Sequence, residues 1–236
     1  MYGDEYRDWK GWSGDLFGVV TPVDEAYFNA EVKKFGPLTA SPIRVLEIGF
    51  GNGAFLAYAT KRGWDVVGTE LDPGLVSAAT ARGFSAFTVG DLSRFDSNSF
   101  DFVVAFDVLE HIDRTALEQF VTDVGRVLVP GGRFLARFPN GDSPVGMPHQ
   151  NGDLTHVTAI GRFAVLQLGY AAQLEVVSLS GMAAPLRANS LIRTTHRVIT
   201  GPLKYLINLT KNVLYFPATP VDFVSVNLVA VFLKPT

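Results

Sequence analysis

The 236-residue sequence contains no cysteine, and only four of its residues are histidine. Without a thiol the chain can form no disulfide bond, thiolate zinc site, iron–sulfur cluster or cysteine nucleophile. No run of residues reaches the ~20 consecutive apolar positions of a membrane span, and residues 1–15 lack the apolar stretch of a secretory signal. We therefore expect a cytoplasmic protein whose chemistry depends on carboxylate and imidazole groups.

Acidic residues are nearly absent from the C-terminal quarter of the chain. Residues 1–175 carry 14 Lys+Arg against 22 Asp+Glu, whereas residues 176–236 carry six Lys+Arg and a single acid, Asp222. The whole chain has a net charge of −3, which is not the basic balance of a nucleic-acid-binding protein, so we expect no nucleic-acid partner. The asymmetry of sign indicates an anionic partner near the C-terminus.

Short apolar segments alternate with helical segments from residue 43 onward. The expected strands are 43–48, 65–70, 84–89, 100–106, 133–138, 172–179 and 223–233. The expected helices are 54–62, 73–82 and 115–128, and Pro130-Gly131-Gly132 stops the last of them. This order predicts an α/β fold with a doubly wound, mostly parallel, seven-stranded sheet.

Composition divides the chain into four parts. We expect an aromatic N-terminal cap at 1–40, a ligand-binding core at 41–182, a basic amphipathic insertion at 183–222 and a final core strand at 223–236. Residues 141–157 are rich in Gly, Pro, Asn and Asp, which predicts a loop without regular structure. A loop of this length in a compact domain is usually functional or disordered.

A glycine-rich turn follows the first expected strand, in the sequence Glu47-Ile-Gly49-Phe-Gly51-Asn-Gly53-Ala54. Glycines let the backbone approach a ligand closely, and the following helix begins with free N–H groups. Glu70 lies about 20 residues further on, the spacing of an acid that binds a ribose diol. This pattern alone fits a dinucleotide site as well as other nucleoside sites.

Two further carboxylates favour a cationic ligand. Glu47 precedes the glycines, where it would repel a diphosphate and attract an ammonium group. Asp91 ends the third expected strand, where it can accept a hydrogen bond from an exocyclic amine. Both acids lie on strand ends at the crevice where such sheets bind ligands. A cationic, amine-bearing nucleoside therefore fits better than NAD, and an NAD(P)-dependent oxidoreductase is the more distant alternative.

At these residues the chain resembles the class I methyltransferases that depend on S-adenosylmethionine (SAM) and release S-adenosylhomocysteine. The matching motifs are VLEIGFGNGAF at 45–55, VVGTELDP at 66–73, VGDL at 89–92, FDFVVAFDVLEHI at 100–112 and LVPGGRFLARFPN at 128–140. The resemblance covers roughly residues 40–180. It implies that the strand at 223–233 is the antiparallel strand of this fold.

The resemblance also implies the residues that hold the cofactor. Glu47 and the segment Gly49, Phe50, Gly51, Asn52, Gly53 would lie near the methionine part. Glu70 and Leu71 would bind at the ribose, and Asp91 with the Leu92 backbone at the adenine. Phe106 and Asp107 would lie beside the methyl-bearing sulfur.

Within that class the chain looks most like O-methyltransferases associated with bacterial saccharide and surface-polysaccharide assembly. This resemblance rests on the aromatic start at 6–12, the EIGFGNG form, and PN-G-x-SP followed by GDLTH at 152–156. It implies a small-molecule or glycan acceptor. The expected acceptor-binding residues are Tyr6, Trp9, Trp12, Asn140 and His149. The N-terminal aromatic rings either form a lid over the cofactor and acceptor or only dock the first segment on the core.

A hydroxyl acceptor needs a group that removes its proton, most often His or a carboxylate. His156 is the first candidate, with Asp153 as its orienting partner or as a ligand of a substrate hydroxyl. Alternatively, both side chains only satisfy backbone groups at the entrance of a helix at 159–168. His111 with Glu110 is the second candidate, and it can equally be a structural part of its motif.

We expect no metal, because no close acidic cluster is visible in the sequence, although Asp107, Asp153, His149 and His156 could be suspected. The leading functional hypothesis is methyl transfer to a hydroxyl of a saccharide or related small molecule. The alternatives are an N- or carboxyl-methyltransferase, for which a histidine base is unnecessary, and a SAM-binding scaffold without turnover.

The segment 187–216 contains basic residues and no acid, with apolar residues at a spacing of three to four. This pattern predicts a basic amphipathic helix. It could bind the inner face of an anionic membrane, which suits a lipid-linked acceptor. It could also form a homodimer contact or pack over the active site.

Overall fold

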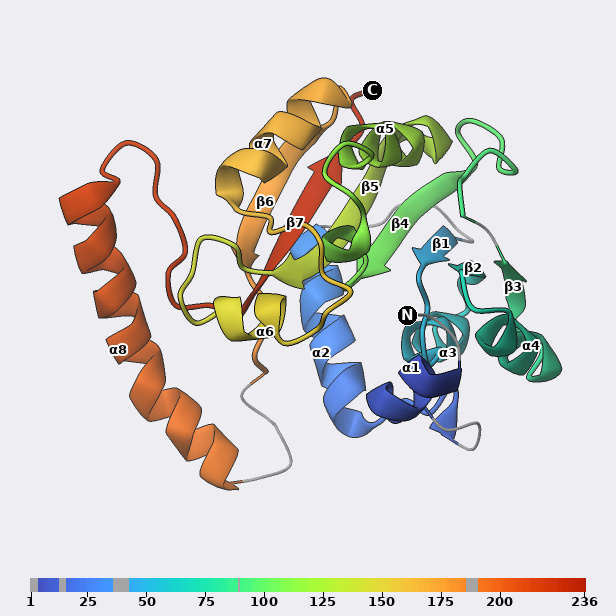
Figure 1. Cartoon of the computed structure of the whole chain (residues 1–236), viewed down its shortest axis with the longest axis horizontal. Coiled ribbons are helices and arrows are strands. Elements are labelled where there is room, and N and C mark those ends of the chain that lie inside the picture. The colour runs from blue at the N-terminus through green and yellow to red at the C-terminus, as the bar shows by residue number, and fades with distance from the viewer. Residues whose placement is uncertain (1–3, 13–15, 36–42, 89, 186–190) are drawn as a thin grey trace.

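The computed structural model describes residues 4–12, 16–35, 43–88, 90–185 and 191–236 (Figure 1). Its sheet contains β1 (Arg44–Ile48), β2 (Asp65–Glu70), β3 (Ser85–Thr88), β4 (Phe100–Phe106), β5 (Leu128–Pro139), β6 (Glu175–Gly181) and β7 (Asn227–Leu233). The strand order is β3-β2-β1-β4-β5-β7-β6, and β7 runs antiparallel to both of its neighbours. The predicted seven-stranded sheet with its antiparallel last strand is confirmed.

Helices cover both faces of the sheet. One apolar core lies under α2 (Pro22–Val32), α3 (Ala54–Lys61) and α4 (Pro73–Ala81). A second core lies under α5 (Leu117–Val127) and α7 (Arg162–Ala171). Strands β1 and β4 are buried on both faces, which is why they read as nearly continuous apolar runs.

The order of the strands creates a crevice at their carboxyl ends. β1 pairs with β2 on one side and with β4 on the other, so the chain winds outward in both directions from β1. Loops at such a switch point diverge and leave space for a ligand. The glycine turn, the short 3₁₀ helix η3 (Leu109–His111) and the N-terminal helix α1 (Asp4–Lys10) each contribute residues to this edge.

Several predicted boundaries differ from the structure. β5 begins at Leu128 and runs through Pro130–Gly132, because the Gly131 N–H donates to the Lys234 carbonyl beyond the end of β7. β7 begins at Asn227 instead of residue 223, since Asn140 and Asn208 bind backbone groups of residues 222–225.

The predicted loop 141–157 contains a short helix, α6 (Met147–Asn151). α7 begins at Arg162 instead of residue 159, and Asp142 accepts a hydrogen bond from the Arg162 N–H at the start of this helix. The prediction of an irregular loop was therefore wrong for five residues, although the segment does lie beside the crevice.

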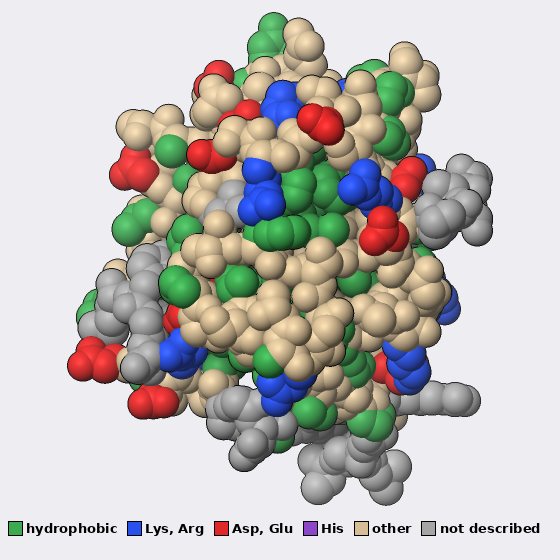
Figure 2. Space-filling model, turned by 90° about the vertical axis from the view of Figure 1, so that its right-hand side faces the viewer, with side chains coloured by type: hydrophobic (Ala, Val, Ile, Leu, Met, Phe, Trp, Pro, Cys, Tyr) green, Lys and Arg blue, Asp and Glu red, His purple; other side chains and the backbone are tan. Residues whose placement is uncertain are grey.

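Helix α8 (Leu191–Tyr215) and the 3₁₀ helix η2 (Lys33–Phe35) complete the described elements. α8 stands at the side of the molecule, away from the sheet (Figure 1). The opposite side, near α4, mixes acidic, basic and apolar side chains (Figure 2). Among the described residues, no helix is long and apolar enough to cross a membrane.

Candidate active site

A cavity of about 700 Å³ occupies the carboxyl edge of β1, β2 and β4. Eleven of the twelve predicted cofactor positions line it: Glu47, Gly49, Phe50, Gly51, Asn52, Glu70, Leu71, Asp91, Leu92, Phe106 and Asp107. The exception is Gly53, which forms the N-cap of α3 beneath the Phe17 ring. The cavity is large enough for a nucleoside-sized ligand, since small-molecule sites usually span about 300–1,000 Å³.

The glycine turn has the shape that the sequence predicts. Gly49 and Gly53 have φ angles of +67° and +72°, which residues with a Cβ rarely adopt. A Cβ at Gly49 would lie 2.6 Å from Val108 Cγ2, and one at Gly53 would lie 2.5 Å from Phe17 Cε1. Neither position accepts a larger residue without movement, so the backbone itself forms this wall of the cavity.

Glu47 is the clearest sign that the cavity takes a hydrogen-bond donor. Its side chain is 3% exposed, and its Oε2 atom has no hydrogen-bond partner among the described residues. Burial, followed by the charge of Glu70, raises the pKa of Glu47 well above its usual value. A cationic ligand with an ammonium group would supply both the missing donor and the missing positive charge.

Glu70 ends β2, and Asp91 follows β3, which ends at Thr88. Glu70 accepts hydrogen bonds from the backbone N–H groups of Gly51 at 3.0 Å and Leu71 at 2.7 Å, so it braces the glycine turn. Asp91 is exposed at the cavity wall, and hydrogen bonds from Ser93 lower its pKa. Their predicted contacts with ribose and adenine stay predictions.

Sequence reasoning missed the partner of Asp107. Arg137 on β5 lies opposite Phe106 in the sheet register, and its Nε atom is 2.9 Å from Asp107 Oδ1. The guanidinium also lies over the Tyr27 and Phe106 rings. Asp107 has a φ of +57°, an uncommon conformation for a residue with a side chain. The sequence signal that could have revealed this pair is Arg137, a charged residue inside the otherwise mostly apolar strand segment RFLARF.

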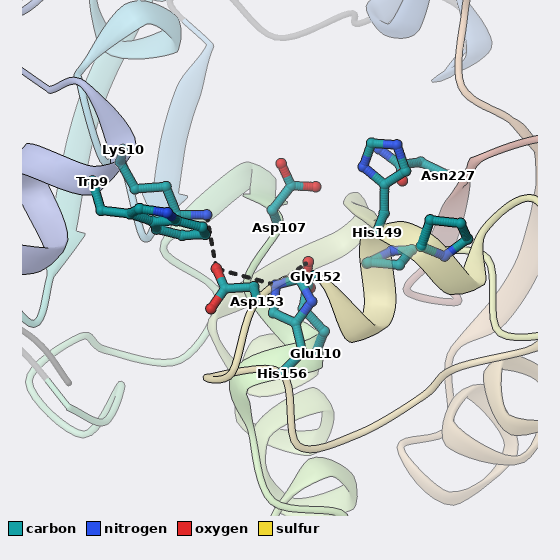
Figure 3. Close-up of a pocket in the computed structure, with 11 residues that line it drawn as sticks. Trp9, Lys10, Asp107, Glu110, His149, Gly152, Asp153, His156 and Asn227 are labelled. Carbon is teal, nitrogen blue, oxygen red and sulfur yellow. Dashed lines mark ion pairs between the residues drawn. The ribbon is translucent and has the colours of Figure 1, made fainter.

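A second, smaller cavity has a volume of about 270 Å³ (Figure 3). Lys10 and Asp107 line both cavities. The remaining walls of the smaller cavity come from Trp9, Glu110, Pro139, Pro148, His149, Gly152, Asp153, His156 and Asn227. The predicted acceptor residues Trp9 and His149 therefore come together here with the predicted catalytic residues Asp153 and His156.

The other predicted acceptor residues do not line this smaller cavity. Trp12 lines the larger cavity and packs on Gly51. Asn140 is fully buried, and its amide donates to the carbonyls of Asp222 and Ser225, so the prediction that it binds substrate was wrong. The side chain of Tyr6 lies outside the described residues.

Asp153 makes stronger contacts with other groups than with His156. Its Oδ1 atom accepts hydrogen bonds from the Thr155 hydroxyl and N–H at 2.6 and 3.0 Å, and its Oδ2 atom is 2.9 Å from Lys10 Nζ. Burial raises its pKa, but these hydrogen bonds and the Lys10 charge outweigh burial and lower it below the usual range. His156 Nε2 is 3.7 Å from Asp153 Oδ2, a separation longer than a hydrogen bond.

Two imidazoles and a buried carboxylate form one cluster. The His111 and His156 ring centroids are 4.7 Å apart, and His156 Nε2 is 3.9 Å from Glu110 Oε1. Burial and the Asp107 charge raise the pKa of Glu110 to about 8. Burial and the neighbouring His156 lower the pKa of His111. His111 lines the larger cavity and Glu110 and His156 the smaller one, so the cluster lies between the two.

The N-terminal segment spans both cavities. Arg7 pairs with Asp72 at 2.8 Å, and Lys10 pairs with Asp153 at 2.9 Å. Trp12 contacts the glycine turn, while Phe17 packs edge-on against Phe50 with ring centroids 6.1 Å apart. The two ion pairs join α1 to residues that line the larger and the smaller cavity, and a cap over the crevice stays a prediction.

Residues 46–136 match the family described as a methyltransferase domain. The chain is 30% identical over 128 residues to a magnesium-protoporphyrin O-methyltransferase of Rhodobacter capsulatus, covering 45% of this chain and 57% of the relative. It is 32% identical over 124 residues to a ubiquinone biosynthesis O-methyltransferase of Xanthomonas oryzae, covering 49% and 48%. The chain thus spans about half the length of these curated relatives.

Solved structures share the fold across nearly the whole chain. A SAM-dependent methyltransferase from Archaeoglobus fulgidus superposes with a TM-score of 0.68 at 16% identity, covering 98% of this chain and 100% of that one. A phosphoethanolamine N-methyltransferase from Haemonchus contortus, solved with SAM, gives a TM-score of 0.65 at 18% identity and covers 98% and 60%. Residues 46–136 therefore match a methyltransferase domain, and the chain shares its fold with solved SAM-dependent methyltransferases.

Proposed function

We propose that the protein transfers a methyl group from SAM to a hydroxyl of a small, saccharide-like acceptor. The observation that carries this proposal is the junction of the two cavities at Lys10 and Asp107. A cofactor in the larger cavity and an acceptor in the smaller one would be neighbours. Methyl transfer is an in-line displacement, so holding the two reactants close and aligned supplies much of the acceleration.

The residues around the larger cavity would bind and orient the cofactor. Glu47 would accept from its ammonium group, Glu70 from the ribose and Asp91 from the adenine amine. The bound cofactor would supply a methyl group on a sulfonium, from which a neutral thioether is a good leaving group. Asp107 lines both cavities and Phe106 lines the larger one, and Arg137 donates a hydrogen bond that holds Asp107 in place.

The lining of the smaller cavity supports a polyhydroxylated acceptor. Asp107, Asp153, His149 and Asn227 offer polar groups, and Trp9 offers an aromatic face. Such a mixture suits a sugar ring, which presents hydroxyls at its edge and C–H groups on its faces. The curated relatives are described as O-methyltransferases, which favours an oxygen acceptor. His156 with Asp153 remains our proposed means of removing the hydroxyl proton in the absence of a metal.

A screen with methyl-labelled SAM against nucleotide sugars, free glycans and matched amino sugars tests this function. We expect label in hydroxyl-bearing acceptors, and a methyl ether in the product by mass spectrometry. Transfer only to amines or carboxylates would contradict the oxygen acceptor. SAM binding without transfer to any member of the panel would favour the scaffold alternative.

We further propose that α8 rests on an anionic membrane surface. Its exposed apolar side chains include Val198, Ile199, Leu203, Leu206, Leu209, Val213 and Leu214, each at least 45% exposed. Asn208 and Asn212 on another face bind the backbone at Val221 and Phe223, so the apolar face points away from the chain. Arg197, Lys204 and Lys211 recur every seven residues along one flank, and the helix contains no acid. A charge of one sign favours anionic lipid over a second copy of the same helix.

Co-sedimentation with vesicles tests the membrane proposal. The full chain should bind vesicles that contain phosphatidylglycerol at low salt, bind neutral vesicles less, and be released as salt rises. No binding to anionic vesicles, or a concentration-dependent dimer that a charged substitution at Leu206 dissociates, would overturn it.

A further inference from the structure

We propose that Glu110, His111 and His156 form a binding site for one divalent transition-metal ion in the wall between the two cavities. One ligand atom from each of these residues lies within 4.8 Å of the others. His156 Nε2 and Glu110 Oε1 are 3.9 Å apart, close to the about 3.4 Å that separates two ligands of a tetrahedral ion at ~2.1 Å. Small rotations of the side chains would complete such a geometry.

The carboxylate of Glu110 points to a missing cation. Its side chain is 1% exposed, and neither of its oxygens has a hydrogen-bond partner among the described residues. An ionised carboxylate is costly to bury without a partner. The groups that face it are the carboxylate of Asp107, the imidazole of His156 and, further away, the cations Lys10 and Arg137. A metal ion between Glu110 and the two imidazoles would satisfy its unpartnered oxygens.

The hydrogen bonds of the two histidines prepare them as ligands. His156 Nδ1 lies 3.2 Å from the Gln150 carbonyl, which can only accept, so Nδ1 carries the proton and the Nε2 lone pair faces Glu110. His111 Nδ1 lies 3.2 Å from the Thr155 carbonyl and 3.0 Å from the Thr155 hydroxyl, whose own proton goes to Asp153. Ligating histidines usually donate their second ring N–H to a carbonyl in this way.

The ligand set indicates the class of ion. Two imidazoles and one carboxylate suit Zn²⁺, Mn²⁺, Fe²⁺ or Co²⁺, whereas Mg²⁺ and Ca²⁺ prefer oxygen ligands. Three protein ligands would leave one position of a tetrahedral ion open, as in catalytic sites. This proposal replaces the expectation of no metal, which considered clusters of acids and overlooked Glu110 as a ligand.

A metal here would change the role of His156 from base to ligand. The acceptor hydroxyl would bind at the open position, where the positive charge lowers its pKa and it releases its proton to solvent. The hydroxyl oxygen would then form the new bond to the methyl carbon. The bond from that carbon to the sulfonium would break, and its electron pair would leave a neutral thioether.

Titration of the chelator-treated full chain with Co²⁺ tests the site. We expect one equivalent to bind by calorimetry, with visible absorption bands typical of nitrogen and oxygen ligands. Glu110→Gln, which keeps the shape and removes the charge, should weaken binding at least 100-fold, and so should His156→Ala. His149→Ala is the matched control from the same pocket and should bind as the wild type does.

Three results would overturn the metal site. They are no stoichiometric Co²⁺ binding to the wild type, equal binding by Glu110→Gln, or equal loss in His149→Ala. SAM affinity and thermal unfolding of each variant show whether it remains folded. Because metal binding is measured without turnover, failure of this proposal is distinguishable from failure of the proposed methyl transfer.

Discussion

The carboxyl edge of the sheet and helix α8 are opposite kinds of surface. At the edge, Glu47 and Glu110 bury carboxylate oxygens that have no hydrogen-bond partner among the described residues. On α8, apolar side chains such as Ile199 and Val213 are 68% and 63% exposed. Both arrangements cost stability in the isolated chain. We propose that each is compensated by a binding partner, a cation at the edge and an anionic lipid surface at the helix.

The largest expected effect is at the edge. Glu47→Gln keeps the shape of the side chain and removes the charge that would face an ammonium group. We expect SAM affinity to fall about 100-fold, or roughly 2.7 kcal/mol, in calorimetric titrations. Asp65→Asn, at the far end of β2, is a matched control and should bind normally. Equal affinity for wild type and Glu47→Gln would contradict the assigned role.

The same substitution should weaken SAM binding but stabilise the unliganded fold relative to the wild type. Because the pKa of Glu47 is raised in the folded protein, folded Glu47 holds a proton that the unfolded chain has released above its ordinary pKa. Its contribution to stability is therefore complete at low pH and lost as pH rises through the folded pKa. In urea unfolding, the free energy of unfolding of Glu47→Gln should rise relative to that of the wild type as the pH increases from 5 to 8. A constant difference across that range would show that Glu47 is not perturbed.

The next largest effect belongs to α8. Replacing Leu206 and Val213 together by serine removes apolar area from its outer face, and vesicle binding should fall at least ~10-fold. Methyl transfer to a soluble acceptor should stay unchanged, since neither residue lines a cavity. Loss of both properties together would mean that α8 supports the fold or the site instead of a membrane contact. Lys204→Gln is the charge control and should mainly reduce the salt dependence of binding.

A smaller effect on stability is expected from the pair formed by Arg137 and Asp107 at the carboxyl edge. Arg137→Met keeps much of the apolar stem and removes the hydrogen bonds to Asp107. Asp107 is partly exposed, so solvent screens the pair and we expect a loss of about 1–2 kcal/mol in the free energy of unfolding. Denaturant titration of single and double variants with Asp107→Asn isolates the pair. Strictly additive losses would show that the two side chains do not interact.

The smallest effect is at the rim of the acceptor pocket. Trp9 is 60% exposed and lines the smaller cavity only. Trp9→Ala should raise the KM for a sugar acceptor about 5-fold, roughly 1 kcal/mol, with little change in kcat or in SAM affinity. Tyr170→Ala, at a fully separate exposed position, serves as the control. A fall in kcat alone would assign Trp9 to closing the site and not to holding the acceptor.

The carboxyl edge of the sheet and helix α8 also differ in how much of each the sequence alone predicts. Glu47, the glycines and Glu70 belong to one strand–turn–helix–strand unit, so local pattern and spacing predict their common location. The α8 helix was predicted from its spacing of apolar residues. The sequence did not show which face of α8 packs against the rest of the chain, because that depends on the contacts of Asn208 and Asn212 with residues 221–223.

Contacts between distant segments account for most of what sequence reasoning missed. Lys10 pairs with Asp153 although most of the core sequence separates them, and the arginine partner of Asp107 lies on the neighbouring strand. Asn140 follows a strand end as a substrate ligand would, yet the loop after α8 buries it. Among the described residues, no group donates a hydrogen bond to the Glu110 carboxylate. This too results from the packing of distant segments, which the neighbouring residues in the sequence do not show.

Calorimetric titration of the full chain with SAM and, separately, with NADH tests the central claim most directly. The claim is that the buried carboxylate of Glu47 and the glycine turn hold a cationic nucleoside. The account predicts that SAM binds with one site per chain and that NADH, with its diphosphate, does not bind. Tight binding of NADH without binding of SAM would contradict it.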